Sequence, residues 1–326
     1  MINFKSRLYK KIISFFLAVF LSFQIQQVYI CAKEFDEDEF LTDILWNKYA
    51  SLNKDKRPTT ALVLGGGGAR GFAHLGVLKS FENENLPIDF VVGVSIGSIA
   101  GLFYCAGFSM DSAIKLAENF KWSSASNLNP LSLFSMLVSD SMLSNEELES
   151  FLNKQIGNID LNGLKIPLIC TAVDLNTGER ILLREGNAAF AARASAAIPG
   201  IFKPVEYKQR FLVDGGLYEN IPVDIARIFD PGIVIAVSVS ADISKNSTDN
   251  IFLTLMQAIY IQGKVFDLKN LQDADIVISP DVGDISAIDL QRTSEAVRKG
   301  FYASQTGMET LKRSLINKTQ WEFLIE

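Results

Sequence analysis

The sequence predicts a three-layer α/β/α domain, in which helices cover both faces of a mainly parallel central sheet. Three observations support this fold class. From residue 59 onward, short apolar runs alternate with longer segments of helical periodicity. The runs at 232–240 and 274–280 lack polar alternation, which is typical of central strands that are buried on both faces. A chain of 326 residues, 48% of them hydrophobic, is also long enough to bury such a core.

The predicted elements follow one another in order. The run at 60–64 is the first strand and ends in a glycine loop. The next segment places apolar residues three positions apart on one helical face: Phe72, Leu75, Leu78 and Phe81. A second short strand ends before Ser95, and strands at 166–175 and 179–185 form a hairpin around Asn-Thr-Gly. Beyond the first helix, we expect helices at 96–107, 108–120, 143–156, 188–198, 221–229 and 293–315.

Charge and cysteine content exclude some classes of protein. The net charge of -6 has no basic block to offset it, so a nucleic-acid partner is not expected. The three cysteines, Cys31, Cys105 and Cys170, match neither a metal-ligand spacing nor a disulfide framework. Cys105 and Cys170 lie in apolar runs, and we expect both to be buried as small hydrophobic residues.

The first 32 residues differ from the rest of the chain. A basic lead, MINFKSRLYKK, precedes the apolar run IISFFLAVFLSF, which predicts a secretory signal peptide cleaved near Ala32. This run is shorter than the roughly 20 apolar residues of a bilayer span. An uncleaved membrane anchor, lipidation of Cys31 and an ordinary cytoplasmic helix stay open as alternatives. The expected location is therefore outside the cytoplasm, periplasmic or secreted, or anchored to the membrane by this segment.

The glycine loop at 65–71 reads Gly-Gly-Gly-Gly-Ala-Arg-Gly and joins the first strand to the first helix. It contains the Gly-x-Gly-x-x-Gly spacing of dinucleotide sites, but Asp89 precedes the second strand, where a ribose-binding acid would follow it. No Gly-Lys-Ser/Thr follows either, so a phosphate-binding P-loop does not fit. Successive glycines leave main-chain N–H groups bare at a helix N-terminus, where an oxyanion can bind.

A second glycine-flanked motif, Gly93-x-Ser95-x-Gly97, follows the second strand. A serine at a sharp strand-to-helix turn has its hydroxyl pushed outward, as in hydrolases that use the serine as a nucleophile. The small flanking residues avoid clashes at such a turn. A serine that only caps the following helix is the alternative.

A third motif supplies a candidate base. Asp214 ends a short predicted strand and is followed by Gly215 and Gly216. Alone this is a turn signal, but with the other two motifs it offers a carboxylate that could accept the serine proton. An aspartate has an ordinary pKa of about 3.9, which burial in an apolar pocket raises. His74, the chain's single histidine, lies one turn into the first helix, and we expect it to pack or hydrogen-bond locally.

Together, the segments GGGGARGFAHLGVL, GVSIGS and DGG resemble the patatin-like phospholipase family, and RASAAIPGIFKPV is similar to its small-residue block before the aspartate. The likeness covers about 59–240 and is greatest to the bacterial branch related to the catalytic domain of neuropathy target esterase. It implies a patatin-like fold, a Ser95–Asp214 dyad, no metal and no cofactor. It also implies an oxyanion loop formed by Gly66, Gly67, Gly68, Ala69, Arg70 and Gly71.

The resemblance also implies the domains and the substrate. Residues 59–326 would be the catalytic domain, after a signal peptide or anchor at 1–32 and a polar acidic lead-in at 33–58 that is a linker or a short helix. The expected partner is a phospholipid or another acyl-ester lipid at a membrane surface. A nucleotide-binding protein and a non-catalytic lipid-binding protein stay open as alternatives. The apolar segment 129–143 is either a mobile cover that meets lipid or a buried connector.

Overall fold

The computed structural model describes residues 37–119, 146–242, 244 and 251–325. The predicted signal peptide or anchor and the segment 129–143 therefore lie outside the described residues. The chain divides into two compact units, residues 1–47 and 48–326. Helix α2 (Glu37–Ser51) and the 3-10 helix η1 (Lys54–Lys56) occupy most of the predicted lead-in, so of its two alternatives a helix is observed. None of the helices in these ranges has the length and apolar character of a membrane crossing.

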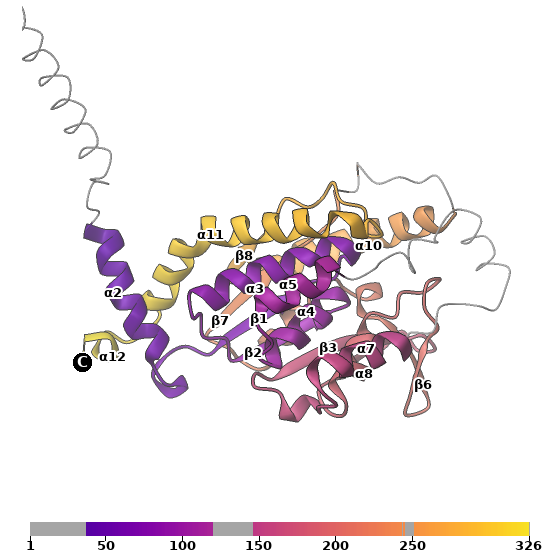
Figure 1. Ribbon diagram of the computed structural model, residues 1–326, viewed down its shortest axis with the longest axis horizontal. Helices are drawn as coiled ribbons and strands as arrows, with labels where there is room; N and C mark the ends of the chain where they lie inside the picture. The colour runs from indigo at the N-terminus through magenta and orange to yellow at the C-terminus, as the bar shows by residue number, and fades with distance from the viewer. Residues whose placement is uncertain (1–36, 120–145, 243, 245–250, 326) are drawn as a thin grey trace, which may run out of the picture. The chain divides into compact units, whose positions relative to one another are not determined.

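A mainly parallel sheet forms the centre of the second unit (Figure 1). Its order is β5-β6-β3-β2-β1-β7-β8, with β4 also paired to β3. Strands β1, β2, β3, β7 and β8 are parallel, whereas β4, β5 and β6 run antiparallel to their neighbours. The bounds are β1 (Thr60–Leu64), β2 (Phe90–Val94), β3 (Leu168–Asp174), β4 (Arg180–Leu183), β5 (Val205–Tyr207), β6 (Arg210–Asp214), β7 (Ile233–Val237) and β8 (Ile276–Ile278).

Helices cover both faces of this sheet, which confirms the predicted three-layer α/β/α class (Figure 1). One layer holds α3 (Ala73–Asn83), α4 (Ile96–Cys105), α5 (Met110–Asn119), α7 (Glu146–Ile156), α8 (Ala188–Ser195) and α11 (Thr293–Asn317). The opposite layer holds α9 (Val223–Ile228) and α10 (Ile251–Gln272), and Ile225 and Leu271 from these helices pack with Val63 and Val92 of the strands. A short last helix, α12 (Glu322–Ile325), follows α11.

The strand and helix predictions have two exceptions. The hairpin of β3 and β4, the long closing helix α11 and the buried cysteines Cys105 and Cys170 are confirmed. The prediction that 274–280 forms a central strand is wrong, because β8 lies at an edge of the sheet and its Val277 is 42% exposed. Helix α10 has no counterpart among the predicted elements. Every residue of the central strands β1, β2 and β7 is buried, which is why their sequences lack polar alternation.

Candidate active site

Ser95 lies on a strained turn between β2 and α4. Its φ of 55° and ψ of -124° fall where non-glycine residues are rarely found, and such strain concentrates at functional positions. The turn brings the first residues of α4 against the end of β1. A Cβ at Gly97 would lie 2.2 Å from the Leu64 carbonyl oxygen, so only glycine permits this approach. The predicted strand–turn–helix context of Ser95 is therefore observed.

A second serine, Ser195 of α8, holds this turn in place. The Ser95 amide donates to Ser195 Oγ over 3.0 Å, and the Ser98 hydroxyl donates to the same oxygen over 2.8 Å. Ser195 in turn donates to the Thr171 carbonyl of β3 over 2.6 Å. This fully buried hydroxyl offsets the strain at Ser95 with hydrogen bonds that water cannot compete for. Sequence reasoning missed Ser195.

Asp214 is brought level with Ser95 by the register of three strands. Val94 pairs with Thr171, the next residue Ala172 pairs with Asp214, and Ser95 directly follows Val94. The Asp214 carboxylate accepts a hydrogen bond from the Ser95 side chain and another from the Gly216 amide, which is 2.8 Å from Oδ1. Burial raises the pKa of Asp214 to about 6, and the two hydrogen bonds oppose this rise.

The main-chain amides of the glycine loop fall into two groups: some form hydrogen bonds within the fold, and others face a cavity. The Gly66 amide donates to the Asn220 carbonyl over 2.9 Å, and the Ala69 amide donates to the Ala287 carbonyl over 2.7 Å. The amides of Gly67 and Gly68 have no acceptor among the described residues, and both glycines line the cavity that contains Ser95 and Asp214. Of the six predicted loop residues, Gly67 and Gly68 are therefore the ones placed to meet an anion beside Ser95.

Arg70 and Gly71 fasten the loop. The Arg70 guanidinium is buried and donates to the Val239 and Ile285 carbonyls, each over 3.2 Å. It also lies 5.1 Å from the centre of the Tyr260 ring, a cation–π distance. These contacts tie the loop to the segments that follow β7 and β8. A Cβ at Gly71 would lie 2.0 Å from Ile96, so the loop also packs tightly against the first turn of α4.

The cavity beside Ser95 is narrow and mostly apolar. Its volume is about 40 Å³, little more than the roughly 30 Å³ of one water molecule. Asn220 and Gly216 complete its polar side. The apolar side comes from the segment after α8, from the 3-10 helix η5 (Gly215–Leu217) and from α10, through Ile198, Pro199, Leu217, Met256 and Ile259. Helix α10 thus forms one wall of this cavity.

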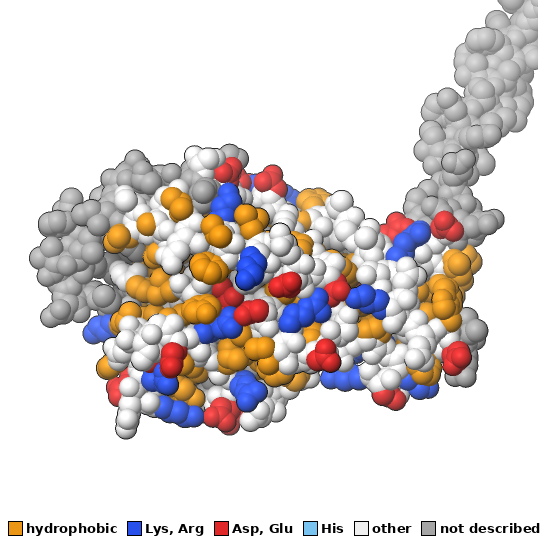
Figure 2. All heavy atoms as spheres, turned by 180° about the vertical axis from the view of Figure 1, so that it is seen from behind, with side chains coloured by type: hydrophobic (Ala, Val, Ile, Leu, Met, Phe, Trp, Pro, Cys, Tyr) orange, Lys and Arg blue, Asp and Glu red, His pale blue; other side chains and the backbone are white. Residues whose placement is uncertain are grey.

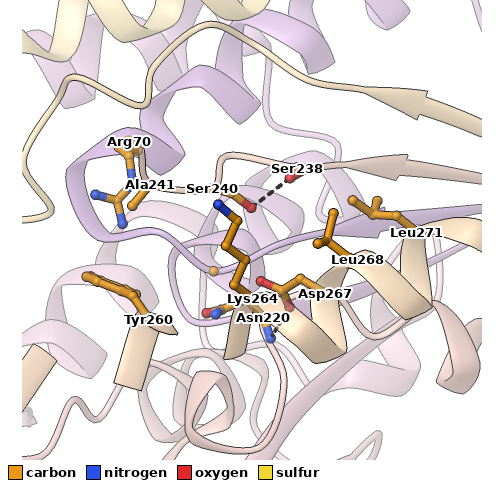
Figure 3. A pocket seen from close by; sticks show the side chains of 11 residues that line it. Arg70, Asn220, Ser238, Ser240, Ala241, Tyr260, Lys264, Asp267, Leu268 and Leu271 are labelled. Carbon is orange, nitrogen blue, oxygen red and sulfur yellow. Dashed lines mark hydrogen bonds between the residues drawn. The ribbon is translucent and has the colours of Figure 1, made fainter. Parts of the chain in front are cut away.

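A second, more polar cavity of about 180 Å³ adjoins the first (Figure 3). Asn220 and Tyr260 line both cavities, and Gly66 lines the second. Lys264 and Asp267 of α10 complete its polar lining, together with Arg70, Ser238 and Ser240. Asn220 has a structural part as well, because its amide donates to Asp267 over 3.2 Å while its carbonyl holds Gly66. Sequence reasoning did not single out Asn220.

His74 packs locally, as expected from the sequence. Its side chain is fully buried, and Nε2 lies 2.7 Å from the Gly65 carbonyl oxygen, to which it donates. Nδ1 has no hydrogen-bond partner among the described residues. Burial lowers the pKa of His74 to about 4, so the imidazole is neutral at physiological pH. His74 does not line the cavity that contains Ser95.

Two other features bear on the alternative readings. Asp89 lies before β2, where its carboxylate pairs with Arg57 at 2.7 Å and accepts from the Thr60 amide. The Asp89 carboxylate is thus engaged by these bonds at the amino ends of the strands, whereas the glycine loop lies at their carboxyl ends. In the ranges that the structure describes, no three His, Cys, Asp or Glu side chains gather closely enough to hold a metal ion.

The chain belongs to the patatin-like phospholipase family, whose family model matches residues 62–227. The expected likeness to the bacterial branch related to neuropathy target esterase is also confirmed. An uncharacterized NTE family protein of Mycobacterium tuberculosis is 28% identical over 273 residues, covering 76% of this chain and 46% of that protein. Patatin-like phospholipase domain-containing protein 6 of Homo sapiens is 33% identical over 193 residues, covering 59% of this chain and 14% of that protein.

The chain spans less than half the length of these two relatives. Among solved structures, human GIVD cytosolic phospholipase A2 is similar, with a TM-score of 0.46 and 12% sequence identity. That similarity covers 86% of this chain and 65% of the phospholipase chain.

Proposed function

We propose that this protein is a serine acyl hydrolase that cleaves carboxylic esters of lipids, of the phospholipase A or lysophospholipase type. The observation that carries the proposal is the cavity that Ser95 shares with the buried Asp214 carboxylate and with the unengaged amides of Gly67 and Gly68. In the proposed mechanism, Ser95 is the nucleophile, Asp214 accepts its proton, and the amides of Gly67 and Gly68 stabilise the anion. All of them lie inside the proposed catalytic domain, residues 59–326.

In the first half-reaction, Ser95 Oγ attacks the ester carbonyl carbon while its proton passes to Asp214. The carbonyl oxygen becomes an oxyanion, and the Gly67 and Gly68 amides donate to it. Losing one such donor typically costs about 3 kcal/mol of transition-state stabilisation. The tetrahedral intermediate then collapses, the leaving alcohol takes the proton from Asp214, and the acyl group stays on Ser95.

In the second half-reaction, water attacks the acyl-serine and gives its proton to Asp214. The same amides meet the new oxyanion. Collapse releases the carboxylic acid, and the proton on Asp214 returns to Ser95 Oγ. One ester and one water therefore become one acid and one alcohol. A carboxylate with a pKa of about 6 is ionised at neutral pH and is more basic than an exposed aspartate, which suits it to both steps.

A lipid substrate is favoured by the apolar wall of the cavity and by the relatives, whose names include phospholipases. Among the described residues, Asp214 is the only acidic or basic side chain that lines this cavity, so an uncharged acyl chain fits its chemistry. We also propose, from residues 1–32 alone, that the protein is exported or held at a membrane.

The proposal is tested by active-site labelling. A fluorophosphonate should modify Ser95, and Ser95→Ala should lose the label together with about 10⁴-fold or more of the turnover of a short acyl ester. Ser98→Ala is the matched control, because the Ser98 hydroxyl donates to Ser195 instead of facing the cavity, and its label should remain on Ser95. No label on the wild type, together with thermal stabilisation by a nucleotide, would favour the nucleotide-binding alternative.

A further inference from the structure

Helix α10 is apolar on two opposite sides. Its inner side contributes Met256, Ile259 and Tyr260 to the cavity of Ser95. Its outer side exposes large apolar residues to solvent, with exposed fractions from 51% to 71%: Leu255, Ile261, Val265, Phe266 and Leu268. A surface helix of a globular protein normally presents polar residues on its outer side. The outer side of α10 therefore has the character of a contact surface.

The exposed residues follow helical spacing. Ile261, Val265 and Leu268 lie four and three positions apart, which places them along one stripe, and Leu255 and Phe266 are exposed beside it. Gly263 and Asp267, which are buried, lie on the other side of the helix. Figure 2 looks onto the layer of α9 and α10 and shows hydrophobic side chains spread between charged ones over this face. The stripe is thus directed away from the sheet.

The solvent-exposed charged residues on the described part of α10 are all positive. Its two lysines, Lys264 and Lys269, are exposed, and neither forms an ion pair with a described residue. Its single acidic residue, Asp267, is 7% exposed and accepts from the Asn220 amide. An apolar stripe flanked by lysines is the pattern of helices that lie in the surface of a membrane containing anionic lipid.

We propose that the outer side of α10, formed by Leu255, Ile261, Val265, Phe266 and Leu268 with Lys269, and with Lys264 at its border with the polar cavity, docks onto an anionic phospholipid bilayer. The apolar side chains enter the boundary between head groups and acyl chains, and the lysines meet lipid phosphates. Because the inner side of the same helix is a wall of the cavity, docking brings Ser95 to the lipid surface. The proposal rests on the proposed function for this last consequence, whereas the binding itself needs no catalysis.

Vesicle co-sedimentation of the full chain tests the binding. Wild-type protein should bind vesicles of phosphatidylcholine with phosphatidylglycerol more tightly than vesicles of phosphatidylcholine alone. Ile261→Ser/Val265→Ser/Phe266→Ser should weaken binding by about tenfold or more, because these contacts are lost from the lipid. Tyr302→Ser, which alters a residue 61% exposed on α11 in the opposite layer, should bind like the wild type. Equal binding by the triple variant, or no preference for phosphatidylglycerol, would overturn the proposal.

Two further readouts separate the remaining explanations. The triple variant should still hydrolyse a dispersed short acyl ester like the wild type, which shows that it folds, and Ser95→Ala should still bind vesicles, so that a failed hydrolase assignment is recognised separately. An environment-sensitive fluorophore on Val265→Cys, with Cys31 replaced by serine, should move to an apolar environment only when vesicles are added. An apolar signal without vesicles, or conversion of a dimer to a monomer by the triple variant, would show that protein covers this surface and would refute lipid docking.

Discussion

Asp214 and His74 are both buried near the strand ends that carry Ser95 and the glycine loop, yet their surroundings differ. Asp214 lines a cavity, accepts from the Ser95 side chain and has its pKa raised to about 6. His74 lies in the core, donates to the Gly65 carbonyl and has its pKa lowered to about 4. Burial disfavours the charged form in both cases, which makes the carboxylate a stronger base and the imidazole a weaker one.

The difference teaches that closeness to the nucleophile in sequence does not make a base. His74 is 21 positions from Ser95 and Asp214 is 119 positions away, but only the aspartate shares a cavity and a hydrogen bond with the serine. A group that deprotonates a hydroxyl must reach it and hold the proton at neutral pH. Instead, the protonated ring nitrogen of His74 donates to the carbonyl of Gly65, two residues before the first candidate oxyanion donor, Gly67.

Of the substitutions that test this comparison, replacing Asp214 should have the largest effect on activity. Asp214→Asn keeps the shape of the side chain but cannot accept the Ser95 proton, so we expect kcat on a short acyl ester to fall by about 10³- to 10⁴-fold. Asp267→Asn is the matched control, because burial also raises the pKa of Asp267 to about 6, but this residue bonds Asn220. A loss of similar size in Asp267→Asn would mean that the assay reports a general effect of neutralising a buried carboxylate.

The same substitution should stabilise the fold at neutral pH. The folded protein binds the Asp214 proton more tightly than the unfolded chain, whose aspartate has a pKa of 3.8. The carboxylate therefore makes folding less favourable as pH rises from about 4 to about 6, and this cost persists above pH 6. Removing it should raise the free energy of unfolding by about 3 kcal/mol at pH 7, measured by urea denaturation. No gain at pH 7, with a loss of activity, would indicate that the asparagine distorts the turn.

The sequence predicts the residues of the site better than their supports. Gly-x-Ser-x-Gly after an apolar run and Asp-Gly-Gly after another are local patterns, and each requires its own turn. Ser195 supports Ser95 from 100 positions away, and nothing local distinguishes it from other small residues of α8. Likewise, the Gly66 amide is hydrogen-bonded and the Gly67 amide is left without an acceptor among the described residues, and this difference depends on where Asn220 lies in the fold. The sequence does not predict helix α10 because its own apolar residues lie on both sides of the helix, so the hydrophobic pattern lacks the 3.6-residue period of an amphipathic helix.

A substitution in the glycine loop should have the next largest effect on activity. Gly68 has a φ of +58°, and a Cβ there would lie 2.4 Å from the Ala287 carbonyl oxygen, which also accepts from Ala69. Gly68→Ala should therefore shift the donating amides and lower kcat by about 10²-fold. Gly178→Ala, at a φ of +73° with nothing within 4 Å, carries the same backbone strain without the clash and should keep its activity. Equal losses of activity in both variants would point to strain alone.

The pH dependence of activity distinguishes the two titrating groups. If Asp214 must be ionised, kcat/KM on a neutral ester should fall about tenfold per pH unit below a midpoint near 6. The midpoint should persist in Asp267→Asn, whose substituted residue titrates in the same range. A profile that stays flat down to pH 5 would contradict a base with the raised pKa that burial gives to Asp214.

Replacing the histidine should have the smallest effect on activity and the clearest effect on stability. His74→Leu removes the hydrogen bond to Gly65 and should cost about 1–3 kcal/mol of unfolding free energy. In the wild type, the unfolded chain binds a proton near pH 6.5 and the folded protein only near pH 4, so the stability contributed by neutral His74 is lost as pH falls through this window. The variant should lose that dependence. Its kcat should stay within about tenfold of the wild type, since the imidazole meets neither Ser95 nor the cavity, and its pH–rate midpoint should stay near 6. A midpoint that moved with this substitution would return the histidine to the reaction.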